Sequence, residues 1–76
     1  MKAKFRIYYT TNFGETSEVP SNKTFSEACK DAKKIVGSSK MNIAAAEIGF
    51  GVEDIPEGIS EDKMYEHTPG CWRYRV

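Results

Sequence analysis

The stretch Thr24–Gly37, TFSEACKDAKKIVG, decides the fold. Thr24 followed by Glu27 forms a capping-box pattern, in which the hydroxyl accepts from the Glu27 amide and the carboxylate reaches back to the Thr24 amide. Two lysines suit the last turn, and Gly37 is expected to end the helix in the left-handed conformation. The apolar residues recur at the spacing of one helix face: Phe25, Ala28, Cys29, Ala32, Ile35 and Val36. The rest of the chain must therefore supply the surface that this apolar stripe covers.

The segment before the helix predicts a hairpin. Lys4–Thr10, KFRIYYT, alternates between apolar and polar residues, as a half-buried strand does. Thr11–Gly14 has turn chemistry, and Glu15–Val19 is the expected returning strand, ended by Pro20. Phe13 is a large ring within the turn, which is read either as folded over the sheet edge or as an exposed contact residue. One face of the first strand should enter the core: Phe5, Ile7 and Tyr9.

The segment directly after the helix fits two structures. Met41–Ile48 carries apolar residues at helical spacing, but the same stretch continued through Phe50 alternates like a strand. The strand is favoured because Gly49 and Gly51 flank Phe50, and glycine is unfavourable in a helix interior. Small alanines on a strand also let a helix approach closely.

The last third of the chain predicts a surface loop followed by a closing hairpin. Glu53–Asp62 is acidic and rich in turn residues, with Ile55 and Ile59 available to anchor it. The runs Lys63–His67 and Cys71–Val76 are separated by a Thr-Pro-Gly turn. Trp72, Tyr74 and Val76 are expected to face the helix, and Arg73 and Arg75 to face outward.

Together these elements predict a small α+β fold. The expected architecture is a ββαββ-like antiparallel sheet with one amphipathic helix packed on one face. A chain of 76 residues is long enough for a single domain, residues 1–76. No apolar run approaches the ~20 residues of a membrane span, and the charged, alternating N-terminus lacks the apolar region of a secretory signal. We therefore expect a cytoplasmic protein that does not enter a membrane.

No motif indicates catalysis, a metal or a cofactor. His67 is the one histidine, and with Cys71 it would form only half of a zinc site. Cys29 lies on the apolar helix stripe as a small hydrophobic residue, although a bridge between the two cysteines stays open. The Gly-x-Gly at 49–51 lacks the further glycine and the helix of a phosphate-binding loop. The sequence thus predicts a protein that is not an enzyme, with no cofactor and no metal site.

Binding is better supported than catalysis. The formal net charge is zero, which argues against a general nucleic-acid binder, but residues 1–40 carry most of the lysines and arginines. If the first and last strands are neighbours, their outer faces bring together basic side chains and one aromatic ring that could contact a partner. The alternative is that glutamates on adjacent strands, Glu15, Glu18 or Glu66, pair with these charges across the sheet. The candidate binding residues are Lys4, Arg6, Tyr8, Arg73 and Arg75.

The layout resembles that of some very short anti-CRISPR proteins of phages and mobile elements. The resemblance rests on the start Met1-Lys2-Ala3, the helix FSEACKDAKKIV and the final strand CWRYRV. It implies a non-catalytic inhibitor that docks on a host protein or ribonucleoprotein complex, namely an RNA-guided surveillance complex, and blocks its access to DNA. In such proteins basic and aromatic surface residues commonly make the contacts, and here these would be Arg6, Tyr8, Arg73 and Arg75. The acidic loop Glu53–Asp62 departs from this resemblance, because its negative charge does not fit binding to a nucleic-acid channel by positive charge alone. Two other functions stay open: a nucleic-acid-binding module on the same face, and an assembly protein that forms homodimers through a sheet edge.

Overall fold

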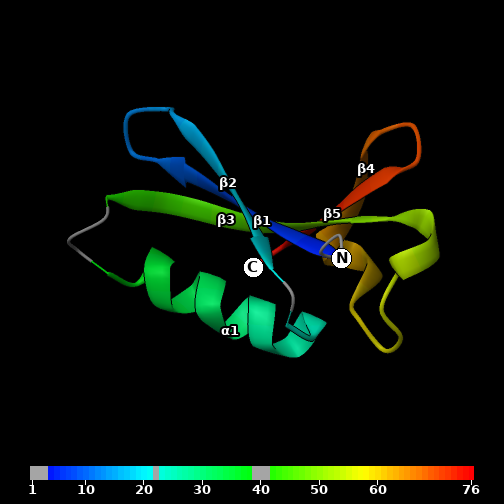
Figure 1. Ribbon diagram of the computed structural model, residues 1–76. Coiled ribbons are helices and arrows are strands. Elements are labelled where there is room, and N and C mark those ends of the chain that lie inside the picture. Colours follow the sequence, from blue (N-terminus) through cyan, green and yellow to red (C-terminus); the bar gives the residue numbers. More distant parts are fainter. Residues whose placement is uncertain (1–3, 22, 39–41) are drawn as a thin grey trace.

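The protein is a five-stranded antiparallel sheet with one helix packed against one of its faces (Figure 1). The computed structural model describes residues 4–21, 23–38 and 42–76. The strands have the spatial order β2-β1-β3-β5-β4, so two hairpins flank the central strand β3. Along the chain the elements are β1 (Phe5–Thr11), β2 (Thr16–Ser21), α1 (Phe25–Val36), β3 (Ile43–Gly51), β4 (Met64–Thr68) and β5 (Cys71–Arg75). The predicted α+β class is confirmed.

The helix forms as its pattern predicts, with one difference at its end. The Thr24 hydroxyl accepts a hydrogen bond from the Glu27 amide at 3.3 Å, which caps the first turn. Ala28 and Ala32 are fully buried against the sheet. Gly37 was expected to be left-handed, but this expectation is wrong: its φ is −76° and its amide continues the helical pattern by donating to the Lys33 carbonyl.

The core lies between α1 and the two strands above it, β1 and β3. Phe25 contacts three other rings edge-on or tilted, at centroid distances of 5.1–6.1 Å. Ile48 of β3 is completely buried, which identifies β3 as the strand on which the helix rests. The buried apolar side chains are Phe5, Ile7, Tyr9, Ala28, Ala32, Ala46, Ile48 and Phe50. Trp72 and Tyr74 of β5, paired with Phe50 and Ile48, extend this core as predicted.

The ambiguous segment after the helix is a strand. From Ile43 onward the chain forms β3; Met41, where the ambiguous stretch begins, lies outside the described residues. Ala46, Ile48 and Phe50 are buried under the helix, and their alternation along the chain is the pattern from which the strand was predicted. The alanine lets α1 lie close to the sheet, as expected from its size.

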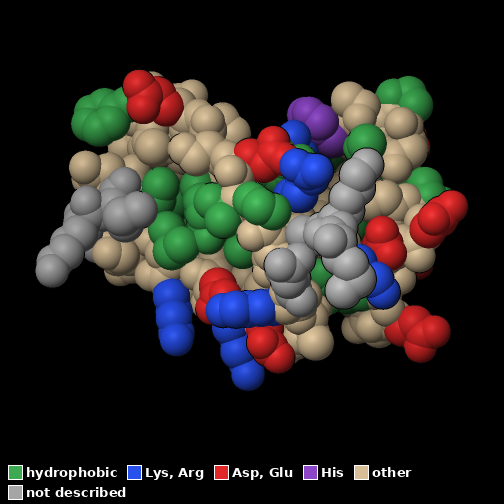
Figure 2. All heavy atoms as spheres, in the orientation of Figure 1, with side chains coloured by type: hydrophobic (Ala, Val, Ile, Leu, Met, Phe, Trp, Pro, Cys, Tyr) green, Lys and Arg blue, Asp and Glu red, His purple; other side chains and the backbone are tan. Residues whose placement is uncertain are grey.

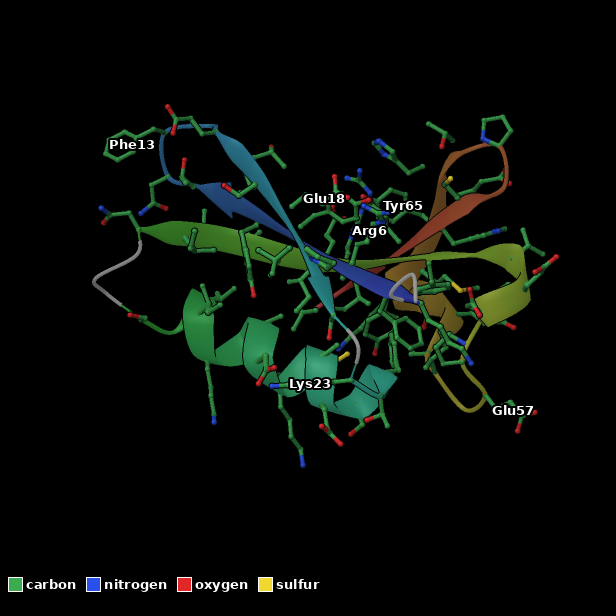
Figure 3. The ribbon with its side chains drawn as sticks, viewed as in Figure 1. Arg6, Phe13, Glu18, Lys23, Glu57 and Tyr65 are labelled. Carbon is green, nitrogen blue, oxygen red and sulfur yellow. The ribbon has the colours of Figure 1, made fainter. Side chains whose placement is uncertain are left out.

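Two details of the hairpins differ from the sequence interpretation. Pro20 lies inside β2, opposite Arg6, and does not end the strand. An edge strand accommodates proline because the missing amide hydrogen need not bond to a neighbour. Phe13 is 81% exposed, so the interpretation that its ring folds over the sheet edge is wrong. Figure 3 shows it at the tip of the β1–β2 hairpin, pointing away from the body of the molecule.

The acidic loop at 52–63 contains two short 3₁₀ turns, Val52–Asp54 and Glu61–Lys63. Ile59 packs against the core as expected, whereas Ile55 is 38% exposed and does not anchor the loop. The closing hairpin has the predicted Thr-Pro-Gly turn, with Gly70 at φ 81°, a conformation that glycine adopts without strain. Among the described residues, no helix has both the length and the apolar character needed to cross a membrane.

Candidate functional site: the helix-free face of the sheet

The sheet has one face that α1 does not cover, and the predicted binding residues lie there. We call it the helix-free face. It is defined by the outward-facing residues of all five strands: Arg6, Tyr8, Glu18, Glu47, Gly49, Tyr65, Arg73 and Arg75. Figure 3 shows Arg6, Glu18 and Tyr65 close together above the sheet, on the side away from α1. In Figure 2 basic, acidic and histidine side chains gather where the surface dips between the two hairpins.

The first and last strands are not neighbours, contrary to the condition on which the site was predicted. Strand β3 lies between β1 and β5. The predicted residues nevertheless meet across it, because β3 contributes Gly49 at the crossing point, opposite both Arg6 and Arg73. A Cβ atom at Gly49 would lie 2.4 Å from Cε2 of Tyr8. The absence of a side chain therefore lets the Tyr8 ring lean across β3 toward β5.

Tyr8 and Arg73 form the centre of the face. The guanidinium carbon of Arg73 lies 4.0 Å from the centroid of the Tyr8 ring, which is the geometry of a cation–π contact. The Arg73 Nη1 atom is also 3.6 Å from Oε1 of Glu47, and both side chains are mostly buried, at 19% and 22% exposure. Arg73 is thus held from two sides, and its orientation is fixed before any partner arrives.

Glu47 connects this pair to the outer hairpin. Its Oε2 accepts a hydrogen bond from the Tyr65 hydroxyl, while its Oε1 faces Arg73. Burial and this hydrogen bond to the carboxylate together raise the pKa of Tyr65, because both disfavour the phenolate. The guanidinium of Arg75 lies 5.1 Å from the Tyr65 ring. Glu47 and Tyr65 were not among the predicted binding residues, because their roles follow from the order of the strands.

Arg6 is paired toward the other edge of the sheet. Its guanidinium donates to Oε1 of Glu18 on β2, and this hydrogen bond raises the pKa of Arg6. Both side chains are about half exposed, so the pair is accessible to solvent and to a partner. The alternative interpretation, that a glutamate on an adjacent strand pairs with the basic charges, is therefore confirmed for Arg6 through Glu18. Arg73 pairs instead with Glu47 of β3, which that interpretation did not name.

A pocket opens at the end of the helix-free face nearest Lys4. It has a volume of about 310 Å³. Lys4, Arg6, Arg73 and Asp54 are the charged residues of its lining, which also includes Tyr8 and His67. We call it the basic pocket. It gathers four of the five predicted binding residues, and Arg75 lies outside it over Tyr65.

The remaining chemical candidates give no site. Cys29 and Cys71 are both free thiols, so the alternative of a bridge between them is not realised. Burial raises the pKa of the Cys29 thiol, as expected for a residue on the apolar stripe. Within the described part of the chain, no group of three or more histidine, cysteine or acidic residues is placed to hold a metal ion.

Comparisons with protein-family models, with curated proteins and with solved structures found no match to this chain.

Proposed function

We propose that this chain is a non-catalytic binding protein that docks on a host protein or ribonucleoprotein complex through the helix-free face and inhibits that complex. The observation that carries the proposal is the fixed Tyr8–Arg73 pair at the centre of a face that no element of the described fold covers. Arginine and tyrosine, together with tryptophan, are enriched among the residues that carry most of the binding energy of protein interfaces. A side chain that is already ordered also loses less entropy on binding.

The class of partner comes from the resemblance to short anti-CRISPR proteins. That resemblance adds inhibition by occlusion, a phage or mobile-element origin and action in the cytoplasm to the proposal. Mixed charge on the face supports a protein surface as the main contact, because Glu18 and Glu47 accompany Arg6 and Arg73. Electrostatic complementarity of this kind favours specificity over general adhesion.

A second candidate is nucleic-acid binding by the same face. Lys4, Arg6 and Arg73 converge on one pocket, and Tyr8 stands beside them, which is the combination used to hold phosphates and bases. Binding of this kind weakens steeply with added salt, because phosphate contacts release counterions. Binding through a protein interface with an apolar centre depends much less on salt.

The test is a pull-down from bacterial lysate with the tagged full chain, with and without nuclease. The variant Arg6→Glu/Arg73→Glu reverses charge on the helix-free face, and Lys30→Glu/Lys33→Glu does so on the exposed side of α1. We expect a nuclease-resistant partner, identified by mass spectrometry, that is lost only with the first variant. Loss of capture after nuclease treatment would favour the nucleic-acid candidate. Retention by both variants would refute the helix-free face as the docking surface.

A further inference from the structure

We propose that the basic pocket receives a single carboxylate side chain, Asp or Glu, from the protein on which this chain docks. The inference rests on the proposed function and narrows it, because it names the chemical group at the centre of the contact. It starts from the composition of the pocket walls: three cationic side chains, Lys4, Arg6 and Arg73, face one carboxylate, Asp54. An anion that enters this space is attracted by Lys4 and by the N–H donors that the two arginines do not use in their pairs with glutamates.

The Arg73 side chain in the pocket is ordered before a ligand binds. The Tyr8 ring and Glu47 fix Arg73, whose side chain is 19% exposed. A guanidinium carries five N–H donors in a planar fork, more than Glu47 alone can use, so donors remain for a second acceptor. Carboxylates match this fork with two parallel hydrogen bonds. The order of the Arg73 side chain therefore favours a planar, two-oxygen ligand.

Glycine gives the pocket its depth. Gly49 and Gly51 contribute to its lining from β3 without side chains, between Tyr8 on one strand and Arg73 and Trp72 on another. The Tyr8 ring occupies the space above Gly49, whereas a Cβ at Gly51 would meet only the Gly70 carbonyl, 4.0 Å away. Glycine in a strand interior often marks a place where another group comes close to the backbone. At Gly49 that group is the Tyr8 ring, so the open space for the incoming side chain lies above Gly51.

The surroundings of the pocket favour one carboxylate over a phosphate chain. Glu18 and Glu47 already pair with Arg6 and Arg73, and Asp54 lies in the wall. Asp54 belongs to the acidic loop, residues 53–62, which follows β3 and carries five carboxylates in all. A nucleic-acid backbone that continued past the pocket would meet these negative charges, whereas a single side chain ends inside the pocket. The charge distribution thus suits a local anion and opposes an extended one.

The experiment is a titration of the ¹⁵N-labelled full chain, followed by amide chemical shifts at low salt. The probes are the peptide acetyl-Gly-Glu-Gly-amide, its glutamine counterpart and a hexathymidine oligonucleotide. We expect the glutamate peptide to shift the amides of Gly49, Gly51 and Arg73 in a saturable manner, and the glutamine peptide to leave them in place. Failure of the glutamate peptide to saturate, or tighter binding of the oligonucleotide, would overturn the proposal.

Variants assign the effect to the pocket. Arg73→Gln should weaken binding of the glutamate peptide about tenfold or more, the value of one charge-assisted hydrogen bond. Arg6→Gln, at a half-exposed side chain outside the core, should weaken it in the same direction and keeps the test valid if Arg73→Gln unfolds the protein. Lys33→Gln on α1 is the matched control and should bind like the parent. Equal binding by all three variants would overturn the proposal.

The two experiments distinguish the proposed docking on the helix-free face from the proposed carboxylate binding in the basic pocket. A pull-down partner that is lost on charge reversal, combined with no peptide binding, would leave the docking face standing and overturn the carboxylate pocket. Saturable peptide binding that depends on Arg73, combined with capture that ignores the helix-free face, would support the pocket and overturn the proposed function.

Discussion

The two faces of the sheet are held together by different physical means. On the covered face, α1 buries apolar side chains, and Phe25 packs among the rings of Phe5, Phe50 and Tyr74. On the helix-free face, charged and aromatic side chains hold each other across strands through cation–π contacts and paired charges. The first arrangement removes apolar area from water, which is the dominant favourable term in folding. The second leaves half-exposed polar groups that are available to a partner.

The contrast suggests that the covered face of the sheet provides most of the stability, and we propose that the helix-free face provides the binding function. Surface ion pairs stabilise folded proteins little, because water and salt screen them and two long side chains lose freedom. The half-exposed Arg6–Glu18 pair of the helix-free face therefore contributes little to the free energy of unfolding, whereas the more buried contacts of Glu47 contribute more. We propose that the order of the exposed side chains serves the recognition of a partner. Substitutions on the two faces should accordingly change different observables.

The largest expected effect is on the covered face. Phe50→Ala removes a ring that is 6% exposed and leaves a cavity beneath Phe5 and Phe25, so we expect a loss of about 3–5 kcal/mol in the free energy of unfolding. Phe13→Ala removes the same ring from a site that is 81% exposed and should change stability by less than about 0.5 kcal/mol. Urea denaturation of both variants measures this difference, and equal losses would contradict the core assignment.

The next effect tests the place where β1 reaches across β3. In Gly49→Ala the new methyl group would lie 2.4 Å from the Tyr8 ring, so the ring must move and its contact with Arg73 is lost. We expect a loss of about 1–3 kcal/mol, the usual range for overpacking. Gly51→Ala is the matched control, since the nearest atom to its Cβ is 4.0 Å away. Equal denaturation midpoints for the two variants would show that Tyr8 does not depend on Gly49.

Most of the covered face could be predicted from the sequence. The spacing of Phe25, Ala28 and Ala32 and the cap at Thr24 predict the helix, because the signals for a helix are local in the sequence. The alternation through Ile48 and Phe50 was enough to favour a strand. These patterns depend only on neighbours along the chain, so no knowledge of strand order is needed to interpret them.

The helix-free face could be predicted only in part. Arg6, Tyr8 and Arg73 were identified by their position on outward strand faces, and the structure brings them together. Their true arrangement depends on β3 lying between β1 and β5, which no local pattern specifies. For the same reason Glu47 was missed, although it pairs with Arg73. A glycine inside a strand pattern was the one available signal, because it often marks a close approach of other groups.

A smaller effect is expected for the hydrogen bond from Tyr65 to Glu47. Tyr65→Phe removes the hydroxyl and should cost about 0.5–1.5 kcal/mol at neutral pH, the net value of a typical hydrogen bond. Tyr8→Phe is the control, because the contact of Tyr8 with Arg73 uses the ring and not the hydroxyl. Denaturation midpoints of the two variants measure the difference, and an equal loss in both would contradict the role given to the Tyr65 hydroxyl.

The same bond predicts a dependence on alkaline pH. The pKa of Tyr65 is raised in the folded state by burial and by Glu47, so its contribution to stability is complete below about pH 10, the ordinary pKa of tyrosine. The contribution is lost as the pH rises through the folded-state value. We expect stability to decline less steeply above about pH 10 in Tyr65→Phe than in the parent. Parallel declines would contradict the assignment.

The smallest effect on stability gives the sharpest test of the contrast between the faces. The pair of Arg6 with Glu18 lies on the helix-free face, and that of Lys23 with Asp31 joins the link before α1 to the helix. Their exposures are similar, at 52% and 43% against 54% and 35%. We expect Arg6→Gln and Lys23→Gln to leave the thermal midpoint unchanged, because exposed pairs are screened by water and salt.

These two variants should nevertheless differ in binding. Arg6 lines the basic pocket and Lys23 does not, so only Arg6→Gln should weaken the glutamate peptide and reduce capture of the partner. Both assays use proteins of equal stability, so a difference between the variants cannot arise from unfolding. Equal binding by Arg6→Gln and Lys23→Gln would show that the location of Arg6 on the helix-free face gives it no special role in binding. The proposal that one face of the sheet serves stability and the other serves recognition would then lose its support.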